Sequence, residues 1–308
     1  MAVFRIIDPP MSHLLQNLLA PLSFGTRFRG PSKPSDPRVY SRALTFQPLI
    51  GFLIGAVAAV LPLFMAVYFR GVQGFMLFAS GVYLFLLEWL TRFDHLHGFD
   101  AACRALAGFG VSPEERLARL GQPGSSPCTA ILIGLKLLLL YLIFMRTALF
   151  GDNMLLAIVL VAVPFFGRTV MLFSYPSERT GDSSAGGIGS VGGAVKLFWT
   201  LTTLLLLAIA LGMLRVYGGD FFSFRTMKLT MSGFGDGGLP PLFALISLGI
   251  EDTGSFLVSG FLTALYWNTE AEKKLKMRPA PCFAGAVCET AELAAMIIFL
   301  ILCDELIF

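Results

Sequence analysis

Runs of about twenty apolar residues recur along the chain, and they constrain its fold more than any other feature. At 1.5 Å per residue, about twenty helical residues cross the roughly 30 Å of hydrocarbon in a bilayer. Of the 308 residues, 56% are hydrophobic and 14% are charged. The sequence therefore predicts an all-α polytopic membrane protein with about seven transmembrane helices. The predicted spans lie near 45–69, 72–90, 128–150, 153–173, 196–216, 241–267 and 288–308.

The sixth run differs from the others because charged residues interrupt it. The segment Glu251-Asp252-Thr253-Gly254 lies within this run, and its carboxylates need protein or water around them at membrane depth. We expect either one span or two half-helices here.

The lysines and arginines between the runs predict the orientation, because positive residues are retained on the cytoplasmic side. Residues 1–44 are expected to form a cytoplasmic N-terminal segment, followed by a transmembrane domain over 45–308. The loops 91–127 and 174–195 are expected on the same side. The loop 268–287 lies on that side as well if the sixth run crosses the membrane. The protein is therefore expected to be integral to the membrane, with its N-terminus in the cytoplasm.

The composition also limits which partners the protein is expected to bind. The net charge of +3 is small and the basic residues are dispersed, which excludes nucleic acid as the expected partner and leaves membrane lipids as the expected surroundings. Five cysteines without a CxxC pair are interpreted as free thiols. The sequence leaves the oligomeric state open.

Residues 91–106 form the strongest candidate for a working site. They follow a long apolar run and contain two of the three histidines. Charged groups so close to a membrane span are costly unless they face water, ligand or one another. The groups concerned are Asp94, His95, His97, Asp100 and Arg104.

Several short blocks occur in order along the chain. They are Phe24-Gly25-Thr26-Arg27, the proline and glycine block 48–55, the segment 95–104, the block 119–124 followed by Lys136, Gly167-Arg168 with Tyr175 and Arg179-Thr180-Gly181, and the block 285–292. Together these blocks resemble the cobalamin synthase family, adenosylcobinamide-GDP ribazoletransferase, over most of the chain. The resemblance implies a membrane transferase that joins adenosylcobinamide-GDP to α-ribazole or its 5′-phosphate and releases GMP. It also implies a corrinoid-nucleotide substrate, and Mg²⁺ held by carboxylates against the pyrophosphate.

Most aspartates of the family's motifs are replaced in this chain. In the family's His-x-Asp-Gly-x-x-Asp-x-x-Asp motif, the three aspartates fall on His97, Ala101 and Arg104. The aspartate of its Thr-Gly-Asp block falls on Cys282, and another motif acid falls on Leu117. An arginine repels a divalent cation but attracts phosphate. The replacements therefore remove most of the ligands expected for Mg²⁺ and leave the phosphate-binding residues.

The resemblance implies a role for each remaining polar residue of the blocks. His95 would orient or deprotonate the attacking hydroxyl, with Asp94 and Asp100 beside it as catalytic residues. Helix capping or a solvated surface is the alternative interpretation for Asp94 and Glu289. The implied substrate-binding residues are Arg104, Arg119, Arg168, Tyr175 and Arg179, and the implied metal ligands are Asp94, Asp100, Glu289 and Glu292.

Three alternatives stay open. A catalytically inactive homologue would keep the fold and bind a corrinoid, a nucleotide or a partner protein. A changed metal site would use a softer ligand set suited to Zn²⁺, drawn from Asp94, His97, Asp100, Cys103 and Cys282. A transporter would use the intramembrane charges of Lys136, Arg168 and Glu251, although the chain shows no inverted repeat.

Overall fold

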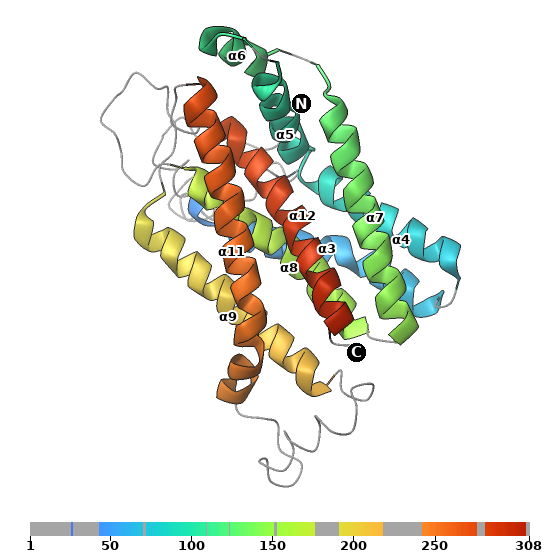
Figure 1. Cartoon of the computed structure of the whole chain (residues 1–308). Helices are drawn as coiled ribbons and strands as arrows, with labels where there is room; N and C mark the ends of the chain where they lie inside the picture. Colours follow the sequence, from blue (N-terminus) through green and yellow to red (C-terminus); the bar gives the residue numbers. More distant parts are fainter. Residues whose placement is uncertain are drawn as a thin grey trace, which may run out of the picture.

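The computed structural model describes Thr26 and residues 43–69, 72–108, 110–122, 124–150, 153–175, 191–217, 242–275 and 281–305. This part of the chain is helical and contains no strand (Figure 1). Each of the seven predicted spans is a helix, which confirms the all-α polytopic class. The elements are α3 (Gln47–Tyr68), α4 (Gln73–Leu90), α5 (Asp94–Leu106), α6 (Pro113–Leu120), α7 (Pro127–Phe150), α8 (Asn153–Met171), the 3₁₀ turn η1 (Leu172–Ser174), α9 (Gly193–Tyr217), α11 (Leu242–Leu275) and α12 (Pro281–Glu305).

Five stretches of helix are long and apolar enough to cross a membrane unaided. They lie in α3, α7, α8, α9 and α12. The sixth candidate is α4 taken together with α5, and the two helices meet at a bend of 85°. Length and composition within the described residues thus support five or six spans, compared with the seven predicted from sequence.

The interrupted sixth run forms one continuous helix. α11 extends unbroken for 34 residues, so the two half-helices considered above are not seen. At 1.5 Å per residue it is about 50 Å long, more than the hydrocarbon thickness. The last turns of α11 therefore extend beyond the apolar layer.

The bend between α4 and α5 uses two residues in the left-handed region. Arg92 has φ 59° and Phe93 has φ 60°. The turn is closed by backbone hydrogen bonds, from the Phe93 N–H to the Glu88 carbonyl at 2.8 Å and from the Asp94 N–H to the Thr91 carbonyl at 3.1 Å. α5 has only 13 residues, about 20 Å, and it carries charges. It is therefore too short and too polar to span a bilayer by itself, and we place it outside the spanning segments.

Small residues set the closest helix crossings. A Cβ at Gly51 of α3 would lie 2.5 Å from the Pro164 carbonyl oxygen of α8, and one at Gly249 of α11 would lie 2.0 Å from the Ala208 carbonyl oxygen of α9. Because a side chain cannot occupy those positions, glycine allows these backbones to approach. Gly51 belongs to the block 48–55, so this part of the family pattern builds the α3–α8 contact.

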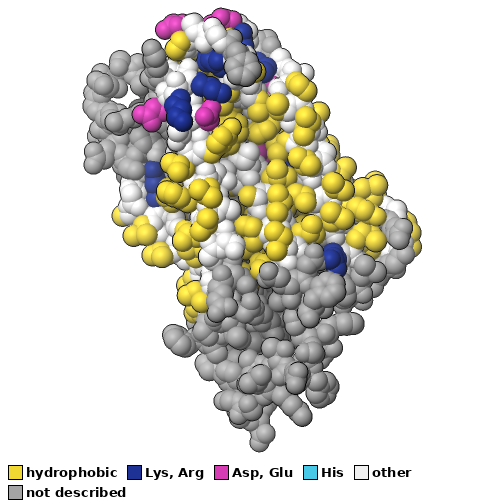
Figure 2. All heavy atoms as spheres, viewed as in Figure 1, with side chains coloured by type: hydrophobic (Ala, Val, Ile, Leu, Met, Phe, Trp, Pro, Cys, Tyr) yellow, Lys and Arg dark blue, Asp and Glu magenta, His cyan; other side chains and the backbone are white. Residues whose placement is uncertain are grey.

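The surface separates into an apolar belt and a charged end. Exposed apolar side chains cover the helices, among them Phe64, Phe78 and Phe198. In Figure 2, most of the visible Lys, Arg, Asp and Glu side chains gather over α5, α6 and the adjoining end of α11. α6 packs against α11, so the predicted loop 91–127 lies beside the described part of α11.

Candidate functional site

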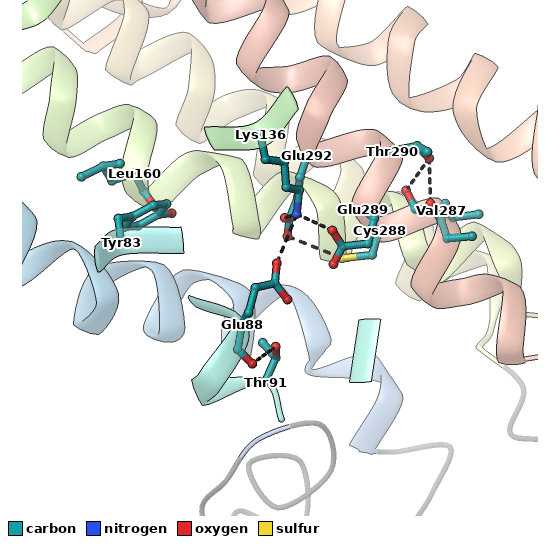
Figure 3. A network of polar contacts seen from close by, with 11 residues as sticks. Tyr83, Glu88, Thr91, Lys136, Leu160, Val287, Cys288, Glu289, Thr290 and Glu292 are labelled. Atoms are coloured by element: carbon teal, nitrogen blue, oxygen red, sulfur yellow. Dashed lines mark hydrogen bonds and ion pairs between the residues drawn. The ribbon is translucent and has the colours of Figure 1, made fainter. Parts of the chain in front are cut away.

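An ion cluster lies in the interior, where α4, α7 and α12 meet. The Lys136 Nζ is paired with Glu88 Oε1 at 3.4 Å, with Glu292 Oε2 at 2.7 Å and with Glu289 Oε2. The Lys136 side chain is fully buried, and none of the three carboxylate side chains is more than 5% exposed. Figure 3 shows the ammonium between the carboxylates. Charges buried at membrane depth are expensive unless they are paired in this way.

A second cation, Arg168 of α8, adjoins this cluster. Its side chain is 1% exposed, and Nη1 donates to Gln47 Oε1 of α3 at 2.9 Å. Its charge interacts with those of Glu88, Glu289 and Glu292. Nη2 is buried and makes no hydrogen bond to the residues that the structure describes. Arg168 is therefore a buried guanidinium with one donor group still to be satisfied.

His95, the first histidine of the candidate segment, turns its Nε2 into the same interior. The residue as a whole is half-buried, but Nε2 is inaccessible and unpartnered among the described residues. Burial lowers the pKa of His95 well below its usual value, and the positive charges of Arg168 and Lys136 lower it further. The imidazole is therefore neutral at neutral pH.

Close backbone contacts hold α5, α8 and α12 around these groups. A Cβ at Gly285 of α12 would lie 2.8 Å from the His95 carbonyl oxygen, and one at Gly167 of α8 would lie 2.5 Å from Glu292 Cγ. These glycines belong to two different blocks of the resemblance. α12 therefore lies directly against the candidate segment 91–106.

Asp100 and Arg104 form a separate structure, named here the α5–α7 clamp together with Ser126 and Thr129. Asp100 Oδ1 accepts from the Ser126 N–H at 2.5 Å and from Thr129 Oγ1 at 2.8 Å, while Oδ2 accepts from Arg104 Nε at 2.9 Å. Burial acts to raise the pKa of Asp100, but the three hydrogen bonds outweigh it and the pKa is lowered. Arg104 Nη1 also donates to the Gln122 carbonyl at 2.5 Å. The clamp fastens the start of α7 to α5.

The other arginines of this region serve different purposes. Arg116 is 6% exposed and donates to carbonyl oxygens at the end of α5, including Ala105 at 2.9 Å and Gly108 at 2.6 Å, so it caps that helix. Arg119 pairs with Glu115 on α6 at 2.8 Å. The structure does not bring Arg119 to Arg168, because Arg119 lies on α6 at the charged end and Arg168 lies inside the bundle (Figure 1).

The acids do not, as arranged, fit the Mg²⁺ site that the resemblance implies. Within the described residues, three potential metal ligands come together in one group, namely Glu88, Glu289 and Glu292. The Lys136 ammonium occupies the position among them that a cation would take. Asp100 engages both of its oxygens in the clamp. No step of the chemistry is therefore derived through a metal, and magnesium dependence stays a prediction.

The remaining predicted site residues are dispersed. Asp94 and His97 are exposed on the first turn of α5, where the His97 Nδ1 lies 2.8 Å from the Phe93 carbonyl oxygen. Tyr175 is buried behind η1, and its carbonyl accepts from Lys196 Nζ at 2.5 Å. Arg179 and the side chain of Cys282 lie outside the described residues.

Two participants in the interior site were not assigned a role from sequence. Glu88 is an isolated acid at the end of an apolar run, and Gln47 opens the first span. The signal that identifies Glu88 is its position, because an acid within a membrane-length run needs a partner in the interior. Lys136 supplies that partner from the third predicted span.

The family model CobS, described as cobalamin-5-phosphate synthase, matches residues 17–300. Neither the curated proteins nor the solved structures give a match.

Proposed function

Because the chain belongs to the CobS family of cobalamin-5-phosphate synthases, we propose that it is a membrane transferase that joins adenosylcobinamide-GDP to α-ribazole or its 5′-phosphate and releases GMP. The observation that carries this proposal is the interior site. Residues from four blocks of the resemblance meet there: His95, Lys136, Arg168, Glu289 and Glu292. A protein that needed the fold alone would have little reason to retain such costly buried charges.

The proposed step is a phosphoryl transfer. A hydroxyl oxygen of the acceptor attacks the cobinamide phosphate, a new P–O bond forms, and the phosphoanhydride bond to GMP breaks. The neutral His95 would accept the hydroxyl proton at Nε2, and Arg168 Nη2 would donate to a phosphate oxygen. Both atoms are buried and have no hydrogen-bond partner among the described residues, which supports these assignments.

The orientation belongs to the same proposal. We place the charged end formed by α5, α6 and the end of α11 in the cytoplasm, where a nucleotide substrate is found, with the protein in the inner membrane of a bacterium. The arginines of the predicted loop 91–127 at this end support that orientation.

The second candidate is a homologue that binds the corrinoid or nucleotide without turnover. One observation favours it. Arg104 stands where the family motif has its third aspartate, and it forms an internal ion pair with Asp100. A cation side chain therefore replaces a carboxylate that the resemblance implies as a metal ligand.

Turnover by the purified protein in lipid nanodiscs separates the two candidates. The protein is given adenosylcobinamide-GDP and α-ribazole, with and without Mg²⁺, and GMP is measured by chromatography. His95→Gln should lower turnover by about 10²–10⁴-fold if the imidazole takes the proton, whereas His97→Gln, a matched change on the exposed side of the same helix turn, should retain it. Binding without GMP release would favour the inactive homologue. An absence of both binding and release would reject both candidates.

A further inference from the structure

Two thiols meet across the α5–α7 clamp. Cys103 of α5, three residues after Asp100, and Cys128, in the first turn of α7, are free cysteines, and their side chains are close enough to interact. The clamp fixes the same interface independently, because Asp100 on α5 binds both Ser126, two residues before Cys128, and Thr129, the residue after it. The two thiols are therefore held together by contacts that do not involve sulfur.

The two thiols differ in accessibility. Cys128 is exposed, so a solute can reach it, whereas Cys103 is half-buried. Burial, assisted by Cys128 and Asp100, raises the pKa of Cys103 to about 12. Cys103 is therefore protonated at neutral pH and a poor first nucleophile, because thiolate is the reactive form. An exposed thiol beside a protected one is the arrangement of an attacking and a resolving cysteine.

We propose that Cys103 and Cys128 are a redox modification site, at which a small-molecule disulfide such as oxidised glutathione converts the two thiols into a reversible disulfide. Cys128 attacks one glutathione sulfur, the S–S bond breaks, and one reduced glutathione leaves. Cys103 then attacks the Cys128 sulfur of the mixed disulfide and the second reduced glutathione leaves. The two thiol protons end on the two glutathione molecules, so two cysteines are oxidised while one disulfide is reduced.

This disulfide would tie α5 to α7 covalently beside Asp100. The proposal does not depend on the transferase activity, since it uses only the geometry of the clamp. Covalent closure of the clamp limits the opening of α5 relative to α7, and a reductant restores the open form. We therefore expect oxidation to raise the thermal unfolding temperature reversibly.

Trypsin provides a direct test, because it cuts after Arg92, Arg104, Arg119 and Lys136 and so places each cysteine in its own peptide, 93–104 and 120–136. The full-length protein in nanodiscs is incubated with oxidised glutathione, alkylated and digested. The expected product is the pair of peptides joined with loss of two hydrogens, and dithiothreitol should separate it. Recovery of both cysteines in alkylated form would overturn the proposal.

Single substitutions test the order of attack. Cys103→Ser should leave a stable glutathione adduct on Cys128, because the resolving thiol is missing. Cys128→Ser should leave Cys103 reduced, because its thiol is protonated and half-buried. A stable adduct on Cys128 in the unmodified protein would show that Cys103 does not reach the mixed disulfide, and the proposal would fail. Serine is close in size to cysteine, so both variants should fold.

Discussion

The ion cluster around Lys136 and the clamp around Asp100 both join helices that are distant in sequence, yet their charges are compensated differently. In the cluster, one ammonium faces three carboxylates in the interior. In the clamp, one carboxylate is shared by a backbone N–H, a hydroxyl and a guanidinium that is partly buried. The cluster therefore depends on a balance of buried charge, and the clamp depends on the fit of neutral and charged donors. Substitutions should affect the two regions very differently.

The largest effect is expected from Lys136→Met. Removing the ammonium leaves three carboxylates in the interior without a cation between them, and breaking a buried pair costs about 3–5 kcal/mol. Thermal unfolding in detergent, followed by circular dichroism, should show a large loss of stability or no folded protein.

A charge-balanced variant separates loss of charge balance from loss of packing. Lys136→Met combined with Glu88→Gln and Glu289→Gln removes three charges at nearly constant volume and leaves Glu292 to balance Arg168, so it should recover most of the lost stability. If this balanced variant is as unstable as Lys136→Met alone, the cluster is not governed by charge balance.

The next effect concerns the packing that brings α8 to the cluster. Gly167→Ala places a methyl group 2.5 Å from Glu292 Cγ and 3.1 Å from the Cys288 carbonyl oxygen, and overpacking of this kind costs about 1–3 kcal/mol. Gly134→Ala is the matched control in α7, because its Cβ would meet nothing within 4 Å. The control should be neutral or gain up to about 1 kcal/mol from helix propensity. Equal unfolding temperatures for the two variants would contradict the close α8–α12 contact.

The helical class can be predicted from sequence, because a membrane constrains both the length and the composition of each spanning segment. The arrangement of charged residues in the interior can be predicted only in part. Lys136, Glu289 and Glu292 were noted, but their pairing depends on the crossing of α7 with α12, which no local pattern encodes. Asp100 was interpreted as a catalytic metal ligand, and the structure shows its two oxygens engaged in the clamp. Its partners Ser126 and Thr129 lie more than twenty residues away, beyond the reach of helix periodicity.

A smaller effect is expected in the clamp itself. Arg104→Met removes the pair with Asp100 and the bond to the Gln122 carbonyl. Because Arg104 is 21% exposed and Asp100 keeps its other two donors, the cost should be about 1 kcal/mol. Arg119→Met, which breaks the more exposed pair on α6, should cost less. A loss from Arg104→Met as large as that from Lys136→Met would remove the distinction between the two regions.

The smallest expected effect is in the turn that joins the two regions, since it follows Glu88 of the cluster and precedes Asp100 of the clamp. Arg92 is exposed and adopts φ 59°, which costs a residue with a Cβ about 1–2 kcal/mol. Glycine removes that cost, but it also gives the unfolded chain more conformational freedom, which destabilises the folded state by about 0.5–1 kcal/mol. Arg92→Gly should therefore stabilise the protein by about 0.5 kcal/mol, measured as a small rise in unfolding temperature.

The control is Arg92→Ala, which keeps the Cβ and should give no such rise. If glycine destabilises more than alanine, Arg92 contributes a contact that outweighs its backbone conformation, and the bend between α4 and α5 is then held by that side chain as well as by the hydrogen bonds to the Glu88 and Thr91 carbonyls.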